Sequence, residues 1–218
     1  MAIAPVYGDS AATPKAVGPL PSLYVTRMLL VRHAQSEWNA VGRWQGQADP
    51  QLTEAGRRQA STAARNLSGF DAVVASPLQR AVETAVKITE FLGLGPVLTE
   101  AGLMERDAGP WQGLTRAEIE DSWPGFLESG ERPDGYEPDV VVLERTRQAL
   151  DRIAGRVDGS TVLVVTHAGV IYTLEESFGE PMVRIPNLSG RWFDFVSGDL
   201  RFGNRVEVVP EGTLSELL

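Results

Sequence analysis

The sequence predicts an α/β fold, namely a three-layer α/β/α sandwich with a largely parallel central sheet and an antiparallel edge hairpin. The apolar runs at 27–33 and 161–166 are short and continuous, which is typical of strands buried on both faces. Segments with helical patterning separate such runs, as expected when helices cover a parallel sheet. Near the end of the chain, two β-rich runs flank Gly198-Asp199 and predict the hairpin.

Two helices and a strand are predicted in the first half of the chain. The first helix covers 52–69, with Thr53 as its N-cap. A strand follows at 70–76. Ser76 is followed by proline, and this pair combines an N-cap with the residue favoured at the first helical position. We therefore expect a helix to open there and to run to about Leu92.

The middle of the chain predicts an excursion from the core, and helices follow it. A capping box at 115–118 indicates a short helix. Residues 121–139 are rich in glycine, proline and acids, so an acidic, lid-like excursion is expected at about 112–139. Further helices are predicted at 140–157 and from about Gly169 onward.

One domain is expected at 27–218, after a flexible N-terminal tail at 1–26. The chain has 218 residues, of which 43% are hydrophobic and 22% charged, and this suits a single globular domain. The tail lacks the basic-then-apolar order of a secretory signal, and Met28 is an alternative natural start. No apolar run reaches the roughly 18 residues of a transmembrane helix, so a cytoplasmic protein is expected.

The composition excludes several classes of function. The formal net charge is −9 and the sequence pI is near 4.8, so neither nucleic acid nor an anionic membrane is an expected partner. The chain has no cysteine, which excludes disulfides, thiolate-bound zinc, iron–sulfur clusters and a cysteine nucleophile. An anionic ligand would need a local basic pocket.

The chain has two histidines, His33 and His167, and each directly follows a predicted buried strand. Ligands of open α/β sheets bind at the carboxyl ends of the strands, so we expect both imidazoles in one crevice. The alternative is that each ring only satisfies hydrogen bonds at its strand end. The repetition of the pattern at two strand ends favours the shared crevice.

Two arginines accompany the histidines. Arg80 falls in the first turn of the helix after Ser76, where free N–H groups and the helix dipole favour an anion. Arg32 lies beside His33 among apolar residues, a costly place for an arginine without a partner. Since a guanidinium fork matches a face of phosphate, the set predicts a phosphoryl site. Taken alone, Arg80 could equally be a solvated helix arginine.

Four sequence blocks resemble those of a known family. They are "RHAQSEWN", "SPLQRAVETA", "ERDAGPWQG" and "VTHAGVI", and they occur in the family's order. Over about 27–210 the chain resembles the histidine phosphatase superfamily, in its phosphoglycerate-mutase-like branch, whose signature is R-H-G-x-[ST]-x-x-N. The resemblance implies a metal-independent phosphatase that hydrolyses small phosphate monoesters and needs no cofactor.

The resemblance also implies a role for each residue of the site. His33 would be the nucleophile that becomes phosphorylated, and Glu105 would be the proton donor. Arg32, Arg80 and His167 would hold the phosphoryl oxygens. Chemistry adds two requirements: the attacking nitrogen must be unprotonated, with the other N–H of His33 fixed by an acceptor, and Glu105 must carry a proton when the alcohol leaves.

Four further residues are candidates for substrate binding: Asn39, Gln45, Gly46 and Arg106. Asn39 closes the signature and is expected to orient phosphate or the nucleophile, while Gln45 and Gly46 match a loop that approaches the substrate. Arg106 could instead simply pair with the preceding carboxylate. No metal site is expected, because two histidines without a cluster of carboxylates make a poor one.

The chain departs from the family pattern at two places. Ala34 stands at the family's glycine, where we expect a rotated but allowed backbone. Mutase members carry a tyrosine soon after the Glu-Arg pair and a basic insertion, whereas this chain has eight acids between 118 and 139. An acidic lid would repel a doubly phosphorylated cofactor, although such runs are usually only a solvated face. A phosphatase is therefore preferred over a mutase.

The sequence leaves other questions open. A cofactor-dependent phosphoglycerate mutase and a catalytically silent phosphate-binding or interaction module are the alternative functions, and the intact set of candidate residues disfavours the silent module. A homodimer through the edge hairpin is an option that nothing in the sequence decides. Most of four tryptophans near the blocks are expected in the core, with one or two walling the pocket. They are Trp38, Trp44, Trp111 and Trp123.

Overall fold

The computed structural model describes residues 25–196 and 198–210, and a six-stranded mixed sheet forms the centre of this part of the chain. Its strands, in the spatial order β3-β2-β4-β1-β5-β6, are β3 (Leu98–Thr99), β2 (Ala72–Ala75), β4 (Thr161–Thr166), β1 (Val25–Arg32), β5 (Ser189–Val196) and β6 (Asp199–Glu207). The first four are mutually parallel, and β5 runs antiparallel to both β1 and β6. The predicted mostly parallel sheet with an antiparallel edge pair is confirmed.

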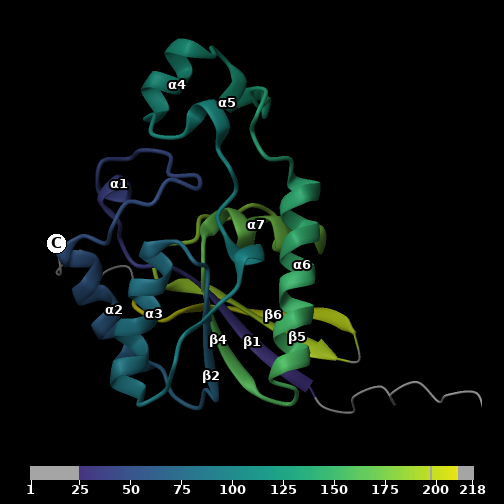
Figure 1. Cartoon of the computed structure of the whole chain (residues 1–218). Coiled ribbons are helices and arrows are strands. Elements are labelled where there is room, and N and C mark those ends of the chain that lie inside the picture. Colours follow the sequence, from purple (N-terminus) through teal and green to yellow (C-terminus); the bar gives the residue numbers. More distant parts are fainter. Residues whose placement is uncertain (1–24, 197, 211–218) are drawn as a thin grey trace, which may run out of the picture.

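Helices cover both faces of this sheet (Figure 1). They are α1 (Glu37–Ala40), α2 (Glu54–Asn66), α3 (Gln79–Leu92), α4 (Arg116–Ser122), α5 (Phe126–Ser129), α6 (Asp139–Arg156) and α7 (Ala168–Ser177). Side chains alternate along each strand, so Leu29 and Val31 pack with residues of α2 and α3 on one face. Met28 and Leu30 pack with residues of α6 and α7 on the other. This alternation accounts for the three layers.

The first strand begins at Val25, two residues before the predicted start of the domain. Thr26 is buried and pairs with Phe195 of β5, so both of these early residues belong to the sheet. The predicted tail at 1–26 is therefore too long at its inner end, and the remaining residues, 1–24, lie outside the described part. No helix in the described part of the chain is long and apolar enough to cross a membrane.

The predicted helix starts are confirmed in two places and wrong in a third. The Thr53 hydroxyl accepts from the Gly56 N–H at 2.9 Å, and Thr115 forms its capping box with Glu118. By contrast, α3 begins two residues later than expected, with Leu78 and not Ser76 as its N-cap. The Ser76 hydroxyl lies instead 2.8 Å from an imidazole nitrogen of His167.

The excursion carries α4 and α5 and projects beyond the carboxyl ends of the strands (Figure 1). It has a small core of its own, in which Trp111 and Ile119 are fully buried and Trp44 and Trp123 pack against them. This packing explains why a segment so rich in glycine and proline keeps a defined structure. Trp111 thus lies inside this core, and Trp44 and Trp123 lie at its margin, although only Trp123 belongs to 112–139.

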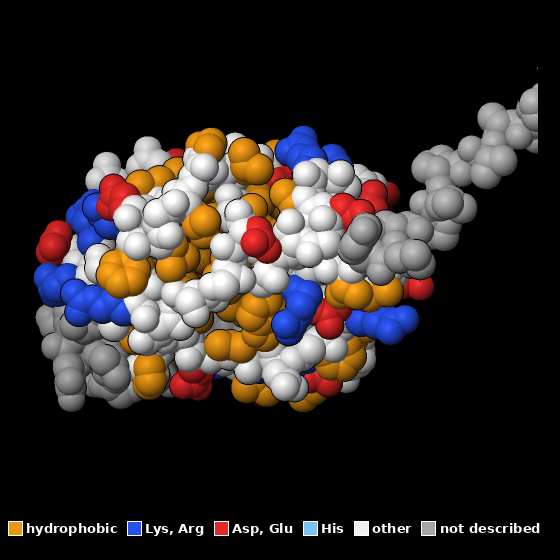
Figure 2. Space-filling model, turned by 90° about the horizontal axis from the view of Figure 1, so that it is seen from below, with side chains coloured by type: hydrophobic (Ala, Val, Ile, Leu, Met, Phe, Trp, Pro, Cys, Tyr) orange, Lys and Arg blue, Asp and Glu red, His pale blue; other side chains and the backbone are white. Residues whose placement is uncertain are grey.

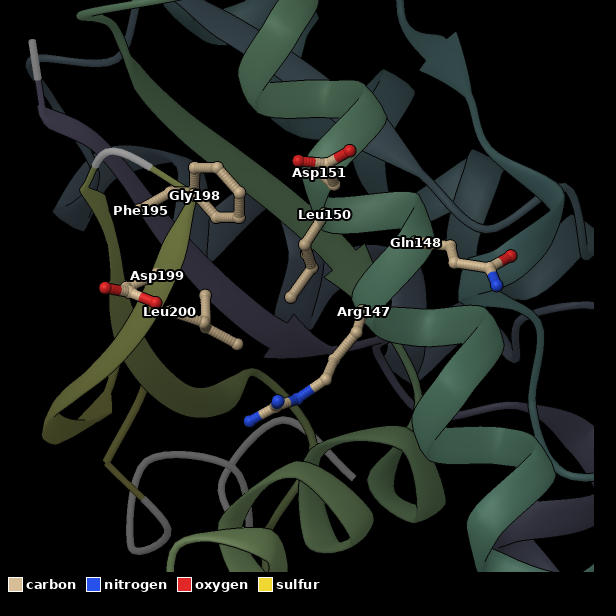
Figure 3. A pocket seen from close by; sticks show the side chains of 8 residues that line it. All are labelled: Arg147, Gln148, Leu150, Asp151, Phe195, Gly198, Asp199 and Leu200. Carbon is tan, nitrogen blue, oxygen red and sulfur yellow. The ribbon is translucent and has the colours of Figure 1, made fainter. Parts of the chain in front are cut away.

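The opposite end of the sheet holds an open pocket of about 440 Å³, between α6 and the β5–β6 hairpin (Figure 3). Arg147, Asp151, Phe195 and Leu200 are among its lining side chains. Strand pairing places this hairpin tip beside Val25, at the start of β1. The pocket therefore lies far from the two histidines, which follow the opposite ends of β1 and β4. Figure 2 shows this end of the molecule, where apolar, basic and acidic side chains are interspersed and no histidine is visible.

Candidate active site

The two histidines follow the ends of neighbouring parallel strands. Arg32 of β1 pairs with Thr166 of β4, and the next residue on each strand is a histidine. The His33 N–H donates to the Thr166 carbonyl at 2.9 Å. The ring centroids of His33 and His167 lie 5.2 Å apart, with both side chains buried. The predicted proximity of the two imidazoles is therefore observed.

Hydrogen bonding gives the nitrogens of His33 different states. Nδ1 lies 2.6 Å from the Ala34 carbonyl, which can only accept, so Nδ1 carries the proton. Nε2 accepts from Nε of Arg80 at 3.2 Å. Burial, and then the charges of Arg80 and Arg32, hold the pKa of His33 well below its usual value. The ring is therefore neutral near pH 7, with a lone pair on Nε2.

The backbone around His33 is held by two residues that the sequence did not single out. Asn187 donates to the His33 carbonyl at 2.7 Å, and Thr84 accepts from the Ala34 N–H at 3.1 Å. Leu188 is the one non-glycine residue with positive φ among those described, so Ala34 has an allowed backbone, as expected. Asn39 contacts His33 only indirectly, through Asn187, whose side-chain amide lies 3.3 Å from Oδ1 of Asn39.

Arg80 is fully buried and held from three sides. It donates to the carbonyls of Gly46 at 2.9 Å and Ala48 at 2.7 Å, in addition to His33. Burial lowers its pKa to about 10, partly offset by the negative charge of Glu105, so it stays cationic at neutral pH. At Gly46 the positive φ of 51° and a lack of room for a Cβ beside Ala108 both require glycine.

Two buried nitrogens at the site lack a protein partner. They are Nε of Arg32 and Nδ1 of His167. The Arg32 guanidinium is anchored elsewhere, through a 2.8 Å bond from Nη1 to the Ile185 carbonyl. Leaving a buried polar group unpaired costs roughly 1–3 kcal/mol, which a bound ligand with oxygen acceptors would remove. Such a ligand would also meet the positive charges of Arg32 and Arg80.

Glu105 faces the same cationic residues. The negative charge of Glu105 partly offsets the lowering of the pKa that burial causes at Arg32 and Arg80. Its oxygens accept from the Arg106 N–H at 2.8 Å and the Gly169 N–H at 3.3 Å. A Cβ at Gly169 would collide with the Glu105 carboxylate, so only a glycine at this position lets the carboxylate lie so close to the backbone.

The Arg106 side chain does not pair with Glu105. It donates to the Glu137 carbonyl and to the Thr173 hydroxyl, both at 2.8 Å, and forms an ion pair with Asp139. These contacts tie the excursion to α7. These contacts occupy the Arg106 side chain with other residues of the protein and do not test substrate binding, so its role in substrate binding stays a prediction.

Gln45 and Asn39 support the loop that approaches the site. The Ser36 hydroxyl donates to Gln45 at 2.6 Å, and Ser36 and Asn39 form the capping box of α1. Their binding roles also stay predictions. Among the residues described, no group of three or more histidine, aspartate or glutamate side chains is placed to hold a metal ion.

Acid is expected to destabilise the protein through these two histidines. The pKa of His33 and of His167 is lowered by burial, so below the ordinary value of 6.5 the unfolded chain binds protons that the folded chain does not. Stability is thus complete above that pH and is lost as the pH falls, by up to about 1.4 kcal/mol per pH unit for each ring. Urea unfolding across this range measures the slope.

The matched variant for this measurement is His167→Asn, which removes one titrating ring. We expect the acid-side slope of its unfolding free energy to be about half that of the unchanged protein. An identical slope in both proteins would show that these imidazoles do not govern the acid response.

Comparisons with known proteins identify the family to which this chain belongs. The family model described as histidine phosphatase superfamily (branch 1) matches residues 28–189. A bifunctional protein of Mycobacterium tuberculosis is 41% identical over 157 residues, which are 68% of this chain and 43% of that protein. The chain therefore spans less than half the length of this relative. Phosphoserine phosphatase 1 of Hydrogenobacter thermophilus is 38% identical over 66% of this chain and 71% of its own length.

A solved structure extends the likeness to three dimensions. The mycobacterial glucosyl-3-phosphoglycerate phosphatase superposes with a TM-score of 0.70 at 29% identity, over 82% of this chain and 97% of that one. The fold, the order of the sequence blocks and the family model thus point the same way. Together with the phosphatase names of these relatives, they support a phosphoric monoester hydrolase of the histidine type.

Proposed function

Because the chain belongs to the histidine phosphatase superfamily, we propose that it hydrolyses phosphate monoesters through a phosphohistidine on His33, without a metal ion. One observation carries the proposal. The bond from Nδ1 to the Ala34 carbonyl leaves the lone pair on Nε2, and Nε2 points to a guanidinium that binds phosphoryl oxygens well. A phosphoryl group placed between Nε2 and Arg80 would replace their mutual hydrogen bond.

The reaction takes place in two steps. In the first, Nε2 of His33 forms a bond to phosphorus, the bond from phosphorus to the alcohol oxygen breaks, and Glu105 gives that oxygen its proton. In the second, a water oxygen forms a bond to phosphorus and the bond from phosphorus to Nε2 breaks, which returns the lone pair to Nε2. The attacking water loses a proton to the Glu105 carboxylate, and phosphate leaves. Arg32, Arg80 and His167 stabilise the charge on the phosphoryl oxygens in both transition states.

The proposed substrates are small phosphorylated metabolites. The names of the relatives include a phosphoserine phosphatase and a glucosyl-3-phosphoglycerate phosphatase, whose substrates are both small monoesters that also carry a carboxylate. The acidity of the excursion is a weaker argument for a phosphatase than the sequence indicated. Three of its acids, Glu118, Glu137 and Asp139, form ion pairs with arginines, which reduces the repulsion of a bisphosphate.

Turnover of p-nitrophenyl phosphate by the purified chain tests the proposal. We expect the same rate with and without EDTA, and a phosphoenzyme that is labile in acid and stable in alkali when labelled substrate is quenched. Loss of activity with EDTA would overturn the metal-independent mechanism. Isomerisation of 3-phosphoglycerate after priming with bisphosphoglycerate, faster than hydrolysis, would favour the mutase alternative.

Glu105→Gln is expected to affect substrates unequally. The variant cannot protonate the leaving oxygen, so hydrolysis of an alkyl phosphate should fall by roughly 10²- to 10⁴-fold. Nitrophenolate leaves without a proton, so its release should fall by less than about tenfold. Single-turnover rates on both substrates measure the difference. Equal losses would mean that Glu105 acts otherwise than as the acid.

A further inference from the structure

His167 holds a neutral imidazole whose two nitrogens have different surroundings. Nε2 lies 2.8 Å from the Ser76 hydroxyl, whereas Nδ1 is buried and has no protein partner. Burial, followed by the charge of Arg80, keeps the pKa of His167 well below its usual value. One nitrogen alone therefore carries a proton near pH 7, and which of them does so decides what the ring can offer a ligand.

The surroundings of Ser76 decide the direction of this bond. Ser76 is fully buried, so its hydroxyl proton must go to an acceptor within the protein. Its other close neighbour is the Leu78 N–H, at 3.4 Å, which can only donate. Nε2 of His167 is thus the acceptor of the hydroxyl proton, and the imidazole proton resides on Nδ1.

We propose that Ser76 is a positioning residue that fixes the Nδ1–H tautomer of His167, so that a neutral imidazole donates a hydrogen bond to a phosphoryl oxygen. The use of this donor rests on the proposed function, whereas the tautomer itself does not. In the opposite tautomer the nitrogen without a partner would present a lone pair to an anion. That arrangement would weaken binding of the phosphoryl group and of the transition state.

The strand ends give this arrangement its rigidity. Ser76 follows β2, and its N–H donates to the Val165 carbonyl of β4 at 2.9 Å. His167 follows β4 itself. Serine and imidazole are therefore fixed by adjacent strands of one sheet, which also accounts for the absence of Ser76 from the N-cap of α3.

Nitrogen NMR of the protein labelled with ¹⁵N-histidine tests the tautomer without any assay of activity. The chain has two histidines, so His167→Asn assigns both sets of signals. We expect His167 of the unchanged protein to carry its proton on Nδ1 near pH 7. In Ser76→Ala we expect a mixture with the Nε2–H form, while His33, held by the Ala34 carbonyl, keeps its state.

Kinetics then test the use of this donor. Ser76→Ala should lower kcat for p-nitrophenyl phosphate by about 10- to 100-fold, and Ser76→Thr, which keeps a hydroxyl, should restore most of it. Finding the Nε2–H tautomer in the unchanged protein would overturn the proposal even if no variant folds. A normal kcat in a folded Ser76→Ala with a changed tautomer would overturn the role in binding alone.

Discussion

His33→Ala is expected to lower kcat by at least about 10⁴-fold, since the substitution removes the nitrogen that is proposed to attack phosphorus. The arginines that are proposed to bind the phosphoryl group remain, so KM should change far less than kcat. The imidazole makes few bonds to the rest of the protein, chiefly to the Ala34 carbonyl and to Arg80. The variant should therefore fold, which thermal unfolding can check before rates on p-nitrophenyl phosphate are compared.

His167→Ala is the matched control, because this buried imidazole is the other histidine of the chain. This variant should turn over slowly but still form the acid-labile phosphoenzyme. His33→Ala should form none. If label appeared on the remaining histidine of His33→Ala, the assignment of nucleophile and phosphate binder would have to be exchanged. More than about a hundredth of the original kcat in His33→Ala would contradict a covalent role for His33.

The core of the site could be predicted because it depends on sheet geometry. Parallel strands place their carboxyl ends at one edge of the sheet. Because His33 and His167 each follow an apolar run, the sequence predicts that the two side chains lie close together. The same rule located the end of β2, but the sequence signal for a helix start at Ser76 gave a wrong prediction of the N-cap. Ser76 followed by proline has the form of an N-cap, yet a tertiary partner, His167, takes its hydroxyl and α3 begins later.

The support around His33 could not be predicted, because it comes from long-range contacts between single side chains. Asn187 is separated from His33 by 154 positions, and nothing near it in the sequence marks it. Thr84 lies within a recognised block, "SPLQRAVETA", but its bond to the Ala34 N–H depends on how α3 packs against β1. Arg106 shows the same limit, since its partners in the excursion and in α7 become neighbours only in the fold.

The excursion illustrates a different limit. Its composition predicts an exposed segment, and α4 and α5 do lie on the outside of the molecule (Figure 1). The charge and glycine content of the segment do not indicate that Ile119 packs with Trp111 in a buried cluster. Arg132 also stacks over Trp111, with its guanidinium carbon 5.2 Å from the ring centre. A few large side chains thus give this segment a core, which its average composition does not indicate.

Arg80→Lys is expected to lower kcat/KM by about 10³-fold although the charge is kept. Arg80 bonds to two carbonyls of the 46–48 loop and to Nε2 of His33, which together need the planar fork of a guanidinium. A lysine amine in its place cannot reach both carbonyls and still face a phosphoryl group. The loss should therefore appear in kcat as well as in KM, and the loop should be held less firmly.

Arg65→Lys is the matched control, because Arg65 lies at the exposed end of α2 and undergoes the same chemical change. Its kcat/KM should equal that of the unchanged protein. Vanadate, which mimics the five-coordinate phosphorus, should inhibit Arg80→Lys far less than Arg65→Lys. A kcat/KM for Arg80→Lys within about tenfold of the unchanged protein would show that positive charge alone suffices at this position. The buried fork would then serve mainly to hold the 46–48 loop, a role that a lower melting temperature of the variant would reveal.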